Sequence, residues 1–305
     1  MQENNTPIKM LNFACGSRFH TDWVNIDFSP LDNRVKKVNL LSTLPFSDNS
    51  FDVAYSSHFL EHLNPHKALD ILKEIKRILK PNGILRIVVP DLENMAQAYL
   101  DTLHKIKNLL PSHSLDSCNE SILWGRGHKK ETGQDSNLQM LIQEYDWLML
   151  EIFDQMVRMR SGGDMGACFE NVKQTQNITL ANFIEHRVGE NVLKKNTQSV
   201  PFASKITLDK ILNKLLSIYL KVLYYLTPRS VASEIFIRTS IGERHKWAYD
   251  SFSLVRLLHQ AQFHHIEQMS FESSHIPHFN EYLLDINADG SPYKGVSSLY
   301  LEARK

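Results

Sequence analysis

Two neighbouring features decide the fold of this chain: the stretch Leu11-Asn12-Phe13-Ala14-Cys15-Gly16-Ser17 and the acid Asp27. The stretch is a short apolar run that ends in a turn of small residues, and Asp27 ends a second run, Trp23-Val24-Asn25-Ile26. Small residues let the backbone of such a turn approach a ligand closely. A carboxylate at the end of the next strand can accept hydrogen bonds from both hydroxyls of a ribose. The pattern predicts the nucleotide-binding half of a doubly wound parallel sheet.

The segments that follow alternate between strand and helix patterns. A helix begins at Asn64-Pro65, because Asn is a favourable N-cap and Pro fits the first helical turn. Its apolar residues keep helical spacing up to Leu79, and Pro81-Asn82-Gly83 ends it. A strand, a helix and a strand with short joints form a right-handed parallel unit. Strands are expected at residues 8–13, 24–26, 35–40, 51–56 and 84–89.

Residues 101–240 have a different character and show no strand pattern. They are polar up to residue 133, with a loop expected at residues 125–130. Helices are expected at residues 138–156, 180–193 and 208–226, the first of them stopped at Gly162-Gly163. The segment is too long for a plain loop, so a helical insertion is predicted. The chain then returns to the sheet, with a helix at residues 251–262 and strands at residues 265–271 and 298–302.

Several motifs together resemble one family. Residues 44–62 read LPFSDNSFDVAYSSHFLEH, and residues 76–93 read KRILKPNGILRIVVPDLE. In order and spacing, residues 8–93 resemble the class I S-adenosylmethionine-dependent methyltransferases. The segments GERHKWAYD at residues 242–250 and SLYLEA at residues 298–303 are similar to a bacterial subfamily of the methyltransferase type 11 kind, often linked to surface glycan synthesis.

The resemblance implies an α/β fold and a division of the chain. The fold is a Rossmann-like, doubly wound and mostly parallel sheet with an antiparallel edge strand, plus the helical insertion. Residues 1–100 and 241–305 would form the sheet domain, and residues 101–240 would form an insertion that covers the active site as a lid.

The resemblance also implies which residues bind S-adenosylmethionine. The turn at Ala14–Gly16 would pass under the amino-acid end of the cofactor, and Asp27 would hold the ribose. The family usually has Gly where Ala14 stands, and often Asp where Asn39 stands; Asn39 keeps a carbonyl acceptor for the adenine amine. Two alternatives stay open: Asp27 starts a turn before Ser29-Pro30, and Asn39 is a solvated strand end. The predicted cofactor-binding residues are Phe13, Ala14, Cys15, Gly16, Asp27, Phe28, Asn39, Leu40, Ser56 and Ser57.

Methyl transfer from a sulfonium needs few catalytic groups. The cofactor brings the leaving group, so the protein supplies positioning and, for a poor nucleophile, a base. The candidate catalytic residues are His58, at the end of the fourth strand, and His245. For His58 a structural role is equally open, and for His245 the alternative is packing of a joint. Glu61 and His62 are expected to brace the turn into the next helix.

The segment around His245 is expected to shape the acceptor site. His245, Tyr249 and Asp250 form the best cluster for it, against the alternative that Trp247 and Tyr249 pack a joint and Asp250 caps the next helix. The fourteen histidines show no zinc-type spacing, so no metal is predicted.

Composition narrows the function classes. The formal net charge is zero, so no global field favours nucleic acid. The N-terminal residues lack an apolar signal core, and no run of 18 uncharged apolar residues occurs, so a cytoplasmic protein without a membrane span is expected. Cys15, Cys118 and Cys168 show no paired spacing and are expected to be free thiols.

The helix at residues 208–226 is expected to pack on its own domain. It carries Lys210, Lys214 and Lys221, so peripheral membrane contact is a less favoured alternative.

The expected function is O-methylation of a small-molecule, sugar or glycan-type acceptor, which rests on the family resemblance. The departures at Ala14 and Asn39 keep an alternative open, a non-catalytic cofactor-binding or assembly module with a methyltransferase fold.

Overall fold

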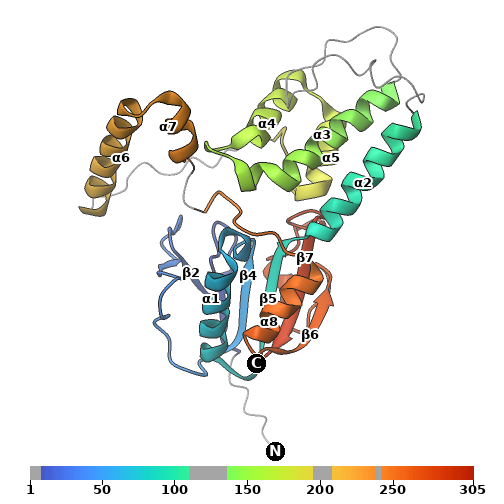
Figure 1. The fold of residues 1–305 in the computed structure, drawn as a ribbon. Helices are drawn as coiled ribbons and strands as arrows, with labels where there is room; N and C mark the ends of the chain where they lie inside the picture. Colours follow the sequence, from blue (N-terminus) through green and yellow to red (C-terminus); the bar gives the residue numbers. More distant parts are fainter. Residues whose placement is uncertain (1–7, 110–135, 195–207, 238, 240–241) are drawn as a thin grey trace, which may run out of the picture.

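The computed structural model describes residues 8–109, 136–194, 208–237, 239 and 242–305. Figure 1 shows a sheet flanked by helices, with a separate group of helices beyond one end of the sheet. The sheet has seven strands in the order β3-β2-β1-β4-β5-β7-β6. The strands are β1 (Met10–Phe13), β2 (Val24–Asp27), β3 (Lys36–Lys37), β4 (Phe51–Ser57), β5 (Leu79–Pro90), β6 (His264–Met269) and β7 (Ser298–Arg304).

The pairing of the strands confirms the predicted sheet. The pairs β2–β3, β1–β2, β1–β4 and β4–β5 are parallel. The strand β7 is antiparallel to both of its neighbours, β5 and β6. The antiparallel pair therefore lies at the edge as expected, with β7 one place inside the edge strand β6. The predicted third strand is shorter than expected, because only Lys36 and Lys37 pair with β2.

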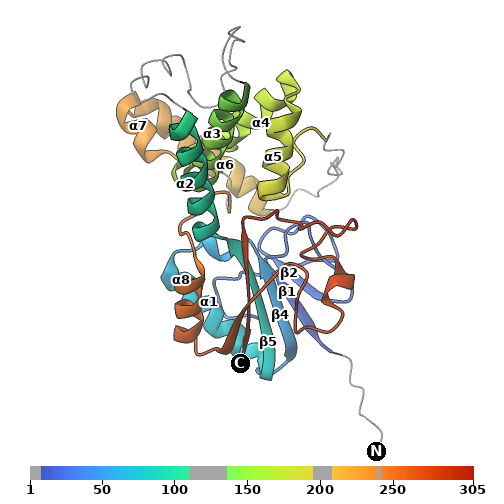
Figure 2. The same cartoon turned by 90° about the vertical axis from the view of Figure 1, so that its right-hand side faces the viewer.

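Helices α1 (Pro65–Ile78) and α8 (Ser251–Gln260) cover one face of the sheet (Figure 2). Both start where the sequence predicts. The Asn64 side chain accepts a hydrogen bond from the Lys67 N–H at 3.0 Å, and Asp250 forms a capping box with Ser253. Buried apolar residues of both helices pack on the parallel strands, including Leu72, Ile75, Leu254 and Leu258.

The other face of the sheet is covered by the segment of residues 270–297. This segment contains a short 3₁₀ helix, η3 (Phe279–Tyr282), whose Phe279 packs against Trp23 and Tyr55. The fully buried Arg86 of β5 holds the segment in place. Its guanidinium donates to Asp285 at 2.7 Å and to Glu302 at 2.8 Å. Arg86, the one charged residue in the predicted stretch 84–89, is thus fully paired.

The second group of helices forms a layer of its own. It comprises α2 (Leu92–Leu109), α3 (Ser136–Val157), α4 (Gly163–Thr175), α5 (Ile178–Val188), α6 (Leu208–Leu226) and α7 (Arg229–Ile235). Trp147, Leu150, Val172 and Ile184 belong to a separate core between α3, α4 and α5. Among the described residues, none of these helices is long and apolar enough to cross a membrane.

Three features of this layer differ from the prediction. The helix α2 begins at Leu92, and the polar segment that starts at residue 101 belongs to it as far as Leu109. The helix α4 was not predicted. Gly162 and Gly163 have positive φ angles of 79° and 55°, so the chain reverses there and begins a new helix instead of a loop. The short helix α7 was not predicted either, and the expected loop at residues 125–130 lies outside the described residues.

The layer is attached to the sheet through the end of α5. The buried Arg187 pairs with Glu151 of α3 at 2.8 Å and donates to Asn94 of α2 at 2.9 Å. Its carbonyl accepts hydrogen bonds from the N–H and the hydroxyl of Ser297, next to β7. The helix ends at Gly189 with a left-handed φ of 75°, before the predicted residue 193. A Cβ on Gly189 would lie 2.2 Å from the carbonyl oxygen of Tyr293, so only glycine fits this crossing.

Candidate active site

The turn after β1 lies at the carboxyl end of the sheet, the end that faces the helical layer (Figure 1). Ala14 and Gly16 both have left-handed φ angles, 54° and 55°. This conformation is easy for glycine and uncommon for a residue with a Cβ. A Cβ on Gly16 would meet no described protein atom within 4 Å. The turn therefore has open space beside its backbone.

Asp27 braces this turn from the end of β2. Its Oδ2 accepts a hydrogen bond from the Gly16 N–H at 3.0 Å, and its Oδ1 accepts one from the Ser29 N–H at 2.8 Å. The hydrogen bond from Ser29 confirms the alternative interpretation that Asp27 starts a turn. A carboxylate has about four lone-pair positions. Two of them stay available for the hydroxyls of a ribose, so the two roles are compatible.

The remaining predicted residues lie around the turn and on the adjoining loops. Phe13 and Leu40 are buried, and Phe28 is 47% exposed. Asn39 is exposed, and its Oδ1 accepts a hydrogen bond from the Leu41 N–H at 3.1 Å. Asn39 therefore stabilises a local turn, and one lone pair of its amide oxygen is left for a ligand.

Cys15 and the serines of β4 lie closer to the core. Burial, together with the negative charge of Asp27, raises the pKa of the Cys15 thiol to about 12, so the thiol is neutral at neutral pH. Ser56 is buried, and its hydroxyl has no hydrogen-bond partner among the described residues, while Ser57 is half-buried. Cys15 and Cys168 are free thiols as expected, and Cys118 lies outside the described residues.

A second cluster of polar side chains lies where β4 ends. His58 follows the strand with a φ of 52°, and the 3₁₀ helix η1 (Leu60–His62) comes directly after it. Glu61 is 1% exposed, and neither oxygen of its carboxyl accepts a hydrogen bond from a described residue. Its Oε1 lies 3.5 Å from Nδ1 of His58 and 3.9 Å from Nε2 of His62. Burial raises the pKa of the Glu61 carboxyl to about 8.

The other ring nitrogen of His58 is also engaged. Its Nε2 lies 3.0 Å from the hydroxyl oxygen of Ser298, at the start of β7. The His58 N–H donates to the carbonyl of Val88 at 2.9 Å, which fixes the backbone against β5. Burial lowers the pKa of His58 well below its usual value, so the imidazole is neutral at neutral pH.

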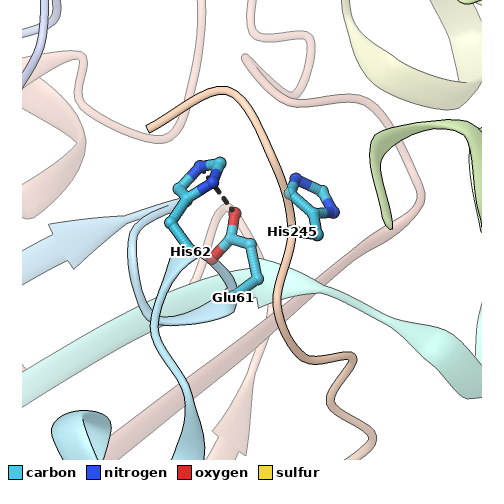
Figure 3. Close-up of side chains that lie close together, drawn as sticks. All are labelled: Glu61, His62 and His245. Carbon is cyan, nitrogen blue, oxygen red and sulfur yellow. Dashed lines mark ion pairs between the residues drawn. The ribbon is translucent and has the colours of Figure 1, made fainter. Parts of the chain in front are cut away.

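The segment of residues 243–247 brings His245 to the same place. The N–H groups of Lys246 and Trp247 donate to the carbonyl of Glu61, at 2.7 and 3.2 Å. On its other side, the His245 N–H donates to the carbonyl of Gln155 near the end of α3, at 2.9 Å. The ring centroids of His245 and His62 are 5.0 Å apart, and Figure 3 shows both imidazoles beside the Glu61 carboxyl. Burial lowers the pKa of His245 to about 3, helped by His62 and Arg158.

Two residues after His245 make structural contacts. Asp250 caps α8, as its alternative interpretation predicts. Tyr249 is buried, and its carbonyl accepts a hydrogen bond from the Leu92 N–H at 2.8 Å, at the start of α2. Trp247 is 45% exposed, so it does not pack the joint that the sequence suggested for it.

Comparison with known proteins gives the class of the sheet domain. Residues 12–87 match a family model described as a methyltransferase domain. The match spans the turn, Asp27 and the His58–His62 segment, and it confirms the predicted class for this part of the sheet, that of the S-adenosylmethionine-dependent methyltransferases. S-adenosylmethionine is the cofactor of this class. The residues fit it, because the turn leaves open space, Asp27 keeps free lone pairs and the Ser56 hydroxyl has no partner in the described part of the chain.

Individual relatives are more distant. The chain is 34% identical over 106 residues to the uncharacterized protein MJ0638 of Methanocaldococcus jannaschii, a match that covers 30% of this chain and 45% of that protein. The chain thus spans less than half the length of this curated relative.

The similar solved structures include S-adenosylmethionine-dependent methyltransferases from Archaeoglobus fulgidus and Mesorhizobium loti. The first is 11% identical, with a TM-score of 0.36, and covers 98% of this chain and 86% of its own. The second is 18% identical, with a TM-score of 0.22, and the match covers 28% of this chain and 47% of that protein. Both TM-scores are low, so the class rests on the family match.

Proposed function

We propose that the whole protein transfers a methyl group from S-adenosylmethionine to a hydroxyl oxygen of a small-molecule acceptor, of the sugar or glycan type. The observation that carries the proposal is the position of two sites at one end of the sheet. The turn with Asp27 and the histidine cluster with Glu61 both follow strand ends, below the helical layer. The glycan class of the acceptor comes from the resemblance of the segments at residues 242–250 and 298–303.

In this proposal the first site holds the cofactor. The backbone at Ala14–Gly16 supports its amino-acid end, Asp27 accepts hydrogen bonds from the ribose hydroxyls, and Asn39 accepts one from the adenine amine. Phe13, Cys15, Phe28, Leu40, Ser56 and Ser57 complete the surroundings of the cofactor. When bound, the cofactor supplies an activated methyl group and its own leaving group.

The second site receives the acceptor. Of the two candidate bases, His58 is the better placed, because the Ser298 hydroxyl at Nε2 orients the imidazole and Glu61 lies 3.5 Å from Nδ1. His58 takes the proton that the acceptor hydroxyl loses. His245 is the second candidate; burial lowers the pKa of both imidazoles, so the choice between them rests on their positions. The helical layer, α2 to α7, acts as a cover that excludes water and selects the acceptor.

Cofactor binding is the first test. The purified protein should bind S-adenosylmethionine or its demethylated product in calorimetry, and Gly16→Val should abolish binding while the sheet stays folded. Gly290→Val is the matched control, because Gly290 also has a positive φ, 81°, and open space for a Cβ. Normal binding by Gly16→Val would show that the turn is not the cofactor site.

Turnover is the second test. Candidate acceptors are incubated with the protein and a labelled cofactor, and their intact masses are followed. The proposal expects a gain of one methyl group on a hydroxyl-bearing acceptor.

A second candidate function is a cofactor-binding or assembly module without turnover. The left-handed Ala14, where the family usually has Gly, and the engaged side chain of Asn39 favour it. Cofactor binding without methyl transfer to any acceptor would support this module, and methyl transfer would exclude it.

A further inference from the structure

We propose that Glu61, His62 and His245 form a binding site for a divalent transition metal ion of the zinc type. Each residue offers one ligand atom, and these atoms lie within 4.8 Å of one another. Figure 3 shows the carboxyl and the two imidazoles converging from η1 and from the segment of residues 243–247. Metal binding is a property separate from the proposed methyl transfer.

The donor set suits this class of ion. Two imidazoles and one carboxylate bind Zn²⁺ in sites that keep an open coordination position. The same set with open positions also binds other first-row divalent ions, such as Fe²⁺. A hard ion such as Mg²⁺ prefers oxygen ligands and is not expected here.

The state of Glu61 is an independent observation that points to a ligand. Its side chain is 1% exposed, and its two oxygens accept no hydrogen bond from the described residues. Buried carboxylates are normally paired, hydrogen-bonded or bound to a metal, because burying the charge alone is costly. His58 and His62 approach Oε1 at 3.5 and 3.9 Å without forming a hydrogen bond, so a bound cation would supply the missing partner.

The tautomer of His62 also suits a ligand. Its Nδ1 lies 3.0 Å from the carbonyl oxygen of Arg244. A carbonyl only accepts hydrogen bonds, so Nδ1 carries the proton and Nε2 keeps its lone pair. That lone pair is on the nitrogen that faces Glu61. Metal-binding histidines are commonly oriented in this way by a backbone carbonyl on the other ring nitrogen.

The distances fit a site that closes on binding. Ligands about 2.1 Å from a tetrahedral zinc ion lie about 3.4 Å apart. The 3.9 Å between His62 and Glu61 therefore needs only a small side-chain rotation. Both peptide segments are fixed, because Lys246 donates to the Glu61 carbonyl and His245 donates to the Gln155 carbonyl. The ion would thus connect the end of β4 to the end of α3.

Two positively charged side chains interact electrostatically with the residues of the site. Arg158 acts on His245, but its guanidinium is paired with Asp154 and with Glu243. The Lys294 ammonium acts on Glu61 and His62, and lies 5.1 Å from the centroid of the Tyr293 ring. Lys294 opposes a second cation, so its removal should strengthen metal binding.

The test uses the full chain, stripped of metal with a chelator and titrated with Zn²⁺ against a chromogenic competitor. One ion per chain is expected, confirmed by elemental analysis after dialysis. His245→Ala and His62→Ala should each weaken binding at least tenfold, and Glu61→Gln should do so while keeping the size of the side chain. Lys294→Met should bind more tightly. His275→Ala is the control, because it removes an exposed His–Glu pair, with Glu267, and should change nothing.

The outcomes separate this inference from the proposed function, since no turnover is measured. Melting curves of the metal-free variants show that each is folded. Binding of less than one ion per chain, or equal affinity in the wild type, His245→Ala and Glu61→Gln, would overturn the site. The three residues would then be a metal-free polar cluster.

Discussion

The sheet buries its apolar residues, whereas the helix pair α6–α7 leaves many of its described apolar residues exposed. In β4 the apolar side chains of Phe51, Val53, Ala54 and Tyr55 are all at most 2% exposed. In α6–α7 the described apolar residues that stay largely exposed are Leu215, Leu216, Ile218, Tyr219, Leu220, Val222, Tyr225, Leu226, Val231 and Ile235. Figure 1 shows this pair standing apart from α3–α5. An apolar pattern thus identifies an element without showing whether its apolar face is covered.

The two parts of the molecule also contribute differently to the site. The candidate binding and catalytic side chains, such as Asp27, His58 and Glu61, come from strand ends and the loops that follow them. The helical layer contributes through backbone carbonyls: Gln155 accepts from the His245 N–H, and Met156 accepts from the Arg244 side chain. The sheet therefore carries most of the candidate groups, and the helices fix the position of the segment that brings His245 to them. Four measurements test this contrast.

The largest effect is expected at His58. His58→Ala should lower the rate of methyl transfer roughly 10²–10⁴-fold at saturating cofactor, because the proton acceptor is lost. The affinity for the cofactor should stay close to the wild-type value in calorimetry. His186→Ala, an exposed histidine on α5, is the control in the helical layer and should transfer at the wild-type rate. A loss of only a few-fold in His58→Ala would indicate positioning instead of proton transfer.

The next effect concerns the buried charge network of the sheet. Arg86→Ala should lower the free energy of unfolding by about 3–5 kcal/mol, because Asp285 and Glu302 would stay buried without their partner. Arg160→Ala removes an exposed pair with Asp164 on α4 and should have little effect. Urea denaturation of both variants gives the comparison. Equal stabilities would contradict a structural role for the buried network.

Core packing gives a matched pair of apolar substitutions. Ile75→Ala in α1 should lower the free energy of unfolding by about 2–5 kcal/mol, because this fully buried side chain leaves a cavity. Leu216→Ala in α6 should change it by less than about 0.5 kcal/mol, because Leu216 is 54% exposed. A large loss in Leu216→Ala would show that α6 is covered in solution, and the contrast between the regions would fail.

The smallest effect concerns cofactor affinity. Asp27→Ala should weaken cofactor binding by about 1–3 kcal/mol, the range for hydrogen bonds to a charged group. Part of the loss would come from the turn, since Asp27 also accepts from the Gly16 N–H. Asp22→Ala, on the loop before β2, is the control. Calorimetry that finds the same affinity in the wild type and Asp27→Ala would exclude the ribose assignment.

Features that depend on near neighbours were predicted from the sequence. The cap at Asn64, the cap at Asp250 and the boundaries of α6 agree with the structure. Each depends on a hydrogen bond or an apolar spacing within a few residues. The start of α2 was missed although Leu92, Met95 and Tyr99 keep helical spacing, because the polar residues that begin at Asp101 interrupt the pattern. The helix α4 was missed because two glycines normally signal a stop.

The sequence by itself determined the order of the strands, the turn after the first strand and the class of the sheet domain, because caps, turns and strand patterns are local. Only the tertiary structure decided that Glu61, expected as a brace, lies beside His62 and His245. It also decided that Asp27 supports the turn after β1, and that α6 leaves many of its described apolar side chains exposed. Contacts between distant segments depend on how the sheet and the helical layer pack. The local spacing of residues in the sequence does not show that packing.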